Sequence, residues 1–167
     1  MTNKIQYPLQ QILAVKKDRV EKAEKVVEEK KRALEVEQEK LKRVTAERDE
    51  IFRHKQDKLI QIREAFDKGT TSDKILQMKA YVKIVEGKLQ QAEQKVAQQT
   101  QQVKQAEQAL AAAKEDLRAR RMEEEKIRIH KEEWEKEALK ELEQQENKEY
   151  DEIGQLIHES QKRKKNN

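Results

Sequence analysis

The sequence predicts an all-α protein in which two long helices form an antiparallel coiled-coil hairpin. Three observations support this prediction: helix breakers are scarce, apolar residues recur at seven-residue spacing in both halves, and one stop-and-start signal separates the halves. Of the 167 residues, 34% are hydrophobic and 43% are charged, with three Gly and one Pro. This apolar content is too low to fill the core of a globule of this size, and such a composition is typical of long helices.

Intrinsic disorder is the competing class, because low hydrophobicity and high charge also favour an unfolded chain. The periodicity of the second half favours a helix over a disordered chain. Every seventh residue there is apolar: Ile75, Val82, Leu89, Val96, Val103, Leu110 and Leu117. A second row, three residues further on, consists mostly of Ala and includes Gln99. These are the two rows of a heptad seam, and their small residues would let a partner helix approach closely.

The first half has a similar row, formed by Leu13, Val20, Val27, Leu34 and Leu41. Phe52, Leu59 and Phe66 follow at the same spacing after a step of eleven residues. We interpret that step as a stutter, which locally unwinds a supercoil. Phe52 and Phe66 are therefore expected in the core.

A turn is predicted at about 68–72. Gly69 suits the left-handed position that ends a helix, and Thr70 or Ser72 can cap the next one. The prediction is a single coiled-coil hairpin over 1–167, with helix one at about 9–67 and helix two at about 72–163. So short a connection requires the two helices to run antiparallel.

A reversal near residue 70 would place residue 13 beside residue 127 and leave 125–167 as an overhang or a fold-back. The heptad row is expected to fail at Glu124, with apolar residues resuming out of phase. Residues 122–152 contain 6 basic and 13 acidic residues, whereas the segment 162–165 is entirely basic.

No enzyme active site, metal site or cofactor site is expected. The absence of Cys excludes disulfides, Cys-based zinc sites and a Cys nucleophile. The three Gly are too far apart for a phosphate-binding loop, and the three His lie outside metal-binding motifs. Neither a membrane-spanning run nor a secretory signal is recognisable, and the net charge of +4 is small. We expect a cytoplasmic protein without direct membrane insertion and without nucleic acid as a partner.

Two basic clusters would lie at neighbouring levels of the hairpin, namely Lys16, Lys17 and Arg19 on helix one and Arg118, Arg120 and Arg121 on helix two. They could form a docking patch for an acidic partner, or they could pair with nearby glutamates such as Glu21, Glu24 and Glu123. Trp134 could anchor a partner or pack against a folded-back tail. Tyr7 is expected to be exposed.

Residues 7–24, with Leu9 and Leu13, Lys16 and Arg19, and the Ala23-Glu24 pair, resemble the opening of the YscO/FliJ family. Members of that family are central-stalk proteins of type III secretion and flagellar export machines. The resemblance implies a non-enzymatic bacterial protein at the cytoplasmic side of the inner membrane, peripheral to the secretion apparatus. It would bind and stimulate the hexameric export ATPase, contact the cytoplasmic ring of the export gate and bind secretion chaperones.

The resemblance also implies which residues face these partners. The end of the hairpin that carries both basic clusters would face the ATPase, and its helix-two residues there would be Arg118, Arg120, Arg121 and Ile127. The candidate partner-binding residues are Leu9, Leu13, Lys16, Lys17, Arg19, Arg118, Arg120, Arg121 and Trp134. The alternative function is a generic structural or scaffold coiled coil.

Overall fold

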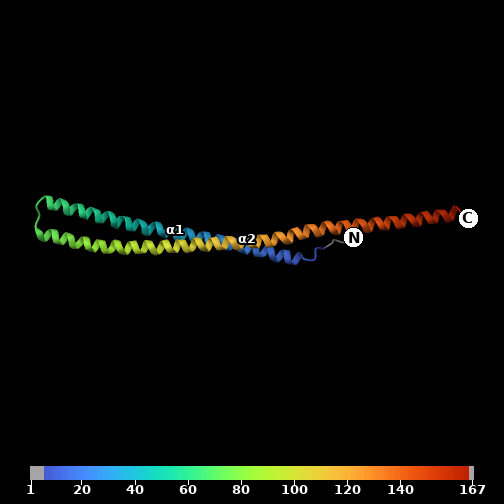
Figure 1. Cartoon of the computed structure of the whole chain (residues 1–167), viewed down its shortest axis with the longest axis horizontal. Coiled ribbons are helices and arrows are strands. Elements are labelled where there is room, and N and C mark those ends of the chain that lie inside the picture. Colours follow the sequence, from blue (N-terminus) through green and yellow to red (C-terminus); the bar gives the residue numbers. More distant parts are fainter. Residues whose placement is uncertain (1–5, 166–167) are drawn as a thin grey trace. The chain divides into compact units, whose positions relative to one another are not determined.

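The computed structural model describes residues 6–165 and consists of two helices, α1 (Gln10–Asp67) and α2 (Ser72–Lys165) (Figure 1). The predicted all-α class, with two long antiparallel helices, is confirmed. The chain divides into two compact units, which we describe separately. The turn unit comprises 24–116, and the terminal unit comprises residues up to 23 together with those from 117 onward.

In the turn unit, α1 ends in a Schellman motif. The amide N–H of Thr70 donates to the carbonyl of Ala65 at 3.2 Å, and that of Gly69 donates to Phe66 at 3.2 Å. Gly69 has a φ of 75°, a conformation that a side chain would disfavour. The carbonyl of Thr71 accepts the first α2 bond, from Ile75. Thr71 therefore occupies the N-cap position, rather than Thr70 or Ser72 as the sequence suggested.

The heptad seam forms the core of the turn unit. Its buried residues are Val27 on α1 and Ile75, Val82, Val85, Leu89, Ala92 and Val103 on α2. All six α2 residues belong to the two predicted rows. The two helices cover each other's apolar stripe, which supplies the packing that single helices of this composition lack.

The predicted stutter in α1 is wrong. Phe52 and Phe66 are 47% and 69% exposed, so neither is a core residue. The half-buried positions continue the original seven-residue spacing instead, through Arg48, Lys55 and Ile62. Long basic side chains can occupy a seam because their aliphatic stems pack while their charged heads reach the edge. Lys55, for example, places its ammonium 3.3 Å from the carboxylate of Glu86 on α2.

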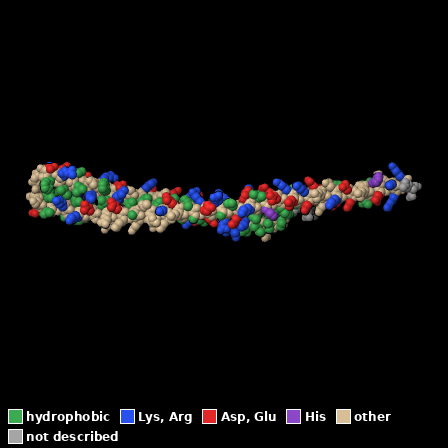
Figure 2. Space-filling model, viewed as in Figure 1, with side chains coloured by type: hydrophobic (Ala, Val, Ile, Leu, Met, Phe, Trp, Pro, Cys, Tyr) green, Lys and Arg blue, Asp and Glu red, His purple; other side chains and the backbone are tan. Residues whose placement is uncertain are grey.

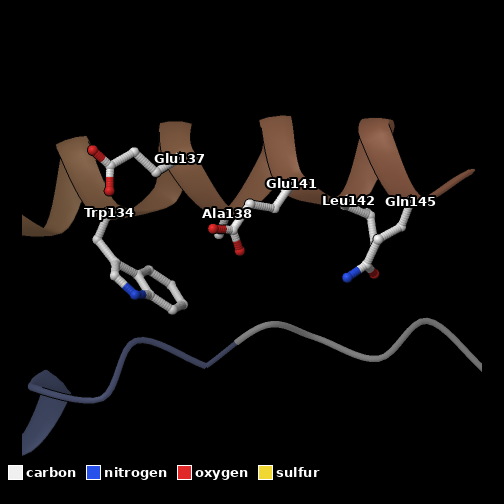
Figure 3. Close-up of a pocket in the computed structure, with 6 residues that line it drawn as sticks. All are labelled: Trp134, Glu137, Ala138, Glu141, Leu142 and Gln145. Atoms are coloured by element: carbon white, nitrogen blue, oxygen red, sulfur yellow. The ribbon is translucent and has the colours of Figure 1, made fainter. Parts of the chain in front are cut away.

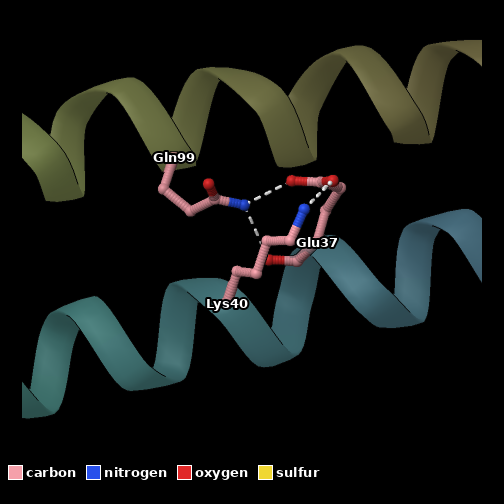
Figure 4. Close-up of polar contacts among 3 residues, drawn as sticks. All are labelled: Glu37, Lys40 and Gln99. Atoms are coloured by element: carbon pink, nitrogen blue, oxygen red, sulfur yellow. Dashed lines mark hydrogen bonds and ion pairs between the residues drawn. The ribbon is translucent and has the colours of Figure 1, made fainter.

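A polar layer interrupts the seam of the turn unit at Gln99 (Figure 4). The amide of Gln99 donates to the backbone carbonyl of Glu37 at 3.0 Å and to its carboxylate at 2.5 Å. Lys40 donates to the same carboxylate at 3.0 Å. The bond from Gln99, followed by that from Lys40, lowers the pKa of Glu37. A half-buried polar pair of this kind fixes the register of two helices, because any slip would leave it unpaired.

In the terminal unit the heptad rows of α2 also persist, contrary to prediction. Glu124, Lys131 and Ala138 are half-buried and keep the spacing of the first row. Ile127 and Trp134 are half-buried and keep that of the second row, so they are in phase. On α1 in the same unit, Leu13, Val20 and Ala23 are buried. Beyond Ala138, α2 continues without a break to Lys165, and every residue over 139–165 is exposed.

We predict that Gly69→Ala lowers the free energy of unfolding by about 1 kcal/mol, because an L-residue is strained at positive φ. No heavy atom lies within 4 Å of the added Cβ, so the loss would come from the backbone alone. Gly87→Ala is the matched control. It adds a methyl group in open space inside α2 and should raise stability by up to about 1 kcal/mol. Urea denaturation followed by circular dichroism measures the free energy of unfolding of both variants. If the two substitutions changed this free energy equally, Gly69 would not hold the left-handed position of a Schellman motif.

A second prediction compares two leucines of the turn unit. Leu89 is 8% exposed in the seam, whereas Leu59 is 40% exposed on the row that the sequence wrongly placed in the core. Leu89→Ala should cost at least about 2 kcal/mol, and Leu59→Ala less than about 1 kcal/mol, because only the former leaves a cavity. If Leu59→Ala proved the more damaging substitution in denaturant unfolding, the register described above would be incorrect.

Candidate protein-interaction surfaces

The two predicted basic clusters meet in the terminal unit, and part of their charge is neutralised there. The ammonium of Lys16 lies 2.8 Å from the carboxylate of Glu123 on α2. This bond lowers the pKa of Glu123, with further contributions from the nearby charges of Arg120 and Arg19. Cations from both helices thus act on this one carboxylate.

The remaining candidate residues differ in accessibility. Lys17, Arg19, Arg118 and Arg121 are exposed, and Leu9 and Arg120 are half-buried. Arg118, Arg120 and Arg121 each take part in an interaction within the chain. Leu13 is only 3% exposed, so it is a core residue that can support a binding surface but cannot itself reach a partner. The partner-binding role of the accessible residues stays a prediction.

An aromatic cluster, formed by Tyr7, His130 and Trp134, closes the seam beside the basic residues. Tyr7 is 4% exposed, which contradicts the expectation that it is exposed. Its hydroxyl lies 2.6 Å from Nδ1 of His130, and its ring meets the edge of Trp134 with 5.5 Å between centroids. Trp134 therefore packs against the segment before α1 rather than against a folded-back tail. The predicted reversal at residue 70 places Tyr7 opposite residue 133, next to Trp134. The position of the reversal could therefore have predicted the aromatic cluster.

Trp134 also borders a surface recess of about 320 Å³ on α2 (Figure 3). Its lining residues all come from this one helix and are Trp134, Glu137, Ala138, Glu141, Leu142 and Gln145. The indole points from α2 toward the segment before α1. The lining of the recess is mostly polar, and it includes the carboxylates of Glu137 and Glu141 and the amide of Gln145.

Exposed apolar residues define two further surfaces. Hydrophobic side chains gather at the end of the turn unit that carries the turn (Figure 2). Phe66 and Leu76 are 69% and 63% exposed there. The second surface is the C-terminal segment of α2, where Tyr150 and Leu156 are 71% and 66% exposed.

Within residues 6–165, no three His, Asp or Glu side chains come together as metal ligands would. Over the same part of the chain, neither helix contains a stretch apolar enough to cross a membrane.

The fold and these surfaces define a class: a two-helix antiparallel coiled coil whose charged and apolar groups are presented on the outside. The family model for YscO-like proteins matches residues 4–164, and the chain therefore belongs to the YscO-like family. The YscO homologue CT670 from Chlamydia trachomatis is 53% identical, with a TM-score of 0.90, and the match covers 95% of this chain and 98% of that one.

A chain in the structure of the Chlamydia pneumoniae CdsV and CdsO protein complex is 45% identical. That match covers 50% of this chain and 98% of the other, with a TM-score of 0.48. The search of the curated proteins gave no match.

The Lys16–Glu123 pair predicts a pH dependence. Because the pKa of Glu123 is lowered in the folded state, its contribution to stability is present above the ordinary glutamate pKa of about 4.3. That contribution disappears as the pH falls through the lowered pKa. Lys16→Met should move the pKa of Glu123 back up, as measured by NMR titration of its side-chain carboxyl carbon. Lys17→Met, at an exposed neighbour, should leave that titration unchanged; an equal shift would contradict the pairing.

Proposed function

We propose that this protein is a non-enzymatic stalk component of a bacterial type III secretion system, acting in the cytoplasm beside the inner-membrane apparatus. It would bind and stimulate the hexameric export ATPase and link it to the export gate and to secretion chaperones. The observation that carries this proposal is membership of the YscO-like family over residues 4–164. The YscO/FliJ resemblance of residues 7–24 agrees with it.

The proposed ATPase contact is the terminal unit. Lys17 and Arg19 are exposed on α1 there, and Arg118 and Arg121 are exposed on α2. Such a cluster can attract an acidic protein surface, and attraction between unlike charges speeds encounter and fixes orientation. These basic side chains would only bind the ATPase, and the hydrolysis of ATP would be carried out by the ATPase alone.

Stimulation requires unequal binding to the states of the ATPase ring. A ligand shifts a conformational equilibrium only by the difference between its affinities for the two states. A stalk inside a six-fold ring cannot contact all six subunits equivalently. It would therefore favour one arrangement of subunits over the others, and the favoured arrangement would pass round the ring as ATP is hydrolysed.

The test is to titrate the purified full chain onto the cognate export ATPase and to measure ATP hydrolysis. We expect the rate to rise, and the double variant Lys17→Glu, Arg19→Glu to need a roughly tenfold higher concentration for half-maximal effect. Arg43→Glu is the control, since Arg43 is an exposed arginine on α1 in the turn unit. If the native chain changes neither ATPase activity nor ATPase assembly, the proposal is wrong.

The link to the export gate needs a separate measurement. A CdsV-like protein is the partner to try first, because a chain 45% identical to this one occurs in the CdsV and CdsO complex. Binding measured by calorimetry, alone and with the ATPase present, distinguishes a linker from a protein that contacts one partner at a time.

A further inference from the structure

The C-terminal segment of α2, residues 139–165, has an apolar stripe with no helix opposite it among the described residues. All of its residues are exposed. The stripe contains Leu139, Leu142, Tyr150, Ile153, Leu156 and Ile157, each between 41% and 71% exposed. At 100° per residue these positions fall within an arc of about 120°, the width of a face that normally packs against another element.

The charge of this segment is divided along its length. Residues 141–152 contain six acidic residues and one basic residue, whereas residues 153–165 contain one acidic and four basic. The border between the two halves coincides with the apolar group around Ile153. A segment of this pattern is complementary to a second copy of itself in the reversed direction.

We propose that two copies of this protein form an antiparallel dimer through residues 143–165 of this segment. The two-fold axis lies between Gly154 and Gln155. The stripe has its own heptad phase, one residue displaced from the two rows of the seam, in which Ile153 holds position a and Leu156 holds position d. In an antiparallel pair, position a of one helix packs against position d of the other. Ile153 of each copy then packs against Leu156 of the second copy, and Tyr150 and Ile157 flank this core.

The same register pairs the charges. Glu146 of one copy lies opposite Arg163 of the second, and Glu143 lies within one turn of Lys164 at the edge of the pair. A parallel pair would place Glu146 against Glu146 and Arg163 against Arg163, and like charges at these positions repel. Charge therefore selects the antiparallel orientation, while the apolar stripe supplies the attraction. Because the same patch serves both copies, the assembly closes at two and does not extend into a filament.

Sedimentation of the full chain over a range of concentrations should show a reversible monomer–dimer equilibrium that weakens as salt is added. Ile153→Asp should raise the dissociation constant by about 100-fold or more, because it would bury a charge at the centre of the interface. Ile129→Asp is the matched control on α2, since Ile129 is 46% exposed against 52% for Ile153 and lies off the stripe. It should leave the dimer intact.

A charge exchange tests the register. Glu146→Arg and Arg163→Glu should each weaken the dimer roughly tenfold, and the double variant should restore it. The orientation is tested with spin labels, because the chain has no Cys and one introduced Cys is a unique site. Labels on Gln155→Cys should lie close together across the dimer, and those on Gln145→Cys roughly 25–30 Å further apart.

Three results would overturn the proposal. The first is a monomer at every concentration at which the chain stays in solution. The second is equal label separations at the two positions, which would indicate a parallel pair. The third is a double charge variant that dimerises no better than either single variant.

Discussion

The heptad seam is the interaction on which the rest of this structure depends. Each helix is polar over most of its circumference, so neither has a stable fold without the other's apolar stripe. The best covered side chain of the described residues, Val85, is still 2% exposed, and most seam positions are only half-buried. Stability is therefore a sum of many small increments. A fold of two helices also encloses no interior, so every functional group of this protein has to act from its surface.

Polar residues within the seam limit how the two helices can be aligned. An apolar stripe alone tolerates slippage by a whole heptad, because one valine or alanine layer resembles the next. Glu37 with Gln99, and Lys55 with Glu86, form pairs that a slipped register would break. These pairs weaken the packing locally but specify one alignment. In the terminal unit, Lys16 with Glu123 and Tyr7 with His130 are pairs of the same kind, which a slipped register of that unit would break.

The seven-residue spacing was sufficient to predict the fold class, because it follows from the repeat of the α-helix. Gly69 was sufficient to predict the reversal, because a glycine is favoured where a helix ends in the left-handed conformation. The two errors along the heptad rows share one cause. Rows were followed by apolar identity, so Phe52 and Phe66 appeared to be core, and Glu124 appeared to end the α2 row. In two helices the geometry of the seam is fixed by the helical repeat, and long charged side chains occupy it with their stems. The Tyr7 contact was missed because it precedes α1, where no periodicity applies.

The contacts of this protein differ widely in the length of chain that separates their partners. Tyr81 lies 27 residues from His54, whereas Lys16 and Glu123 are 107 apart and Tyr7 and His130 are 123 apart. Closing a long loop costs more entropy than closing a short one, so pairing is favoured first beside Gly69 and then proceeds outward layer by layer. The aromatic cluster is the last contact in that sequence. It is also the first to open when the native protein fluctuates, and such local opening leaves the earlier layers paired.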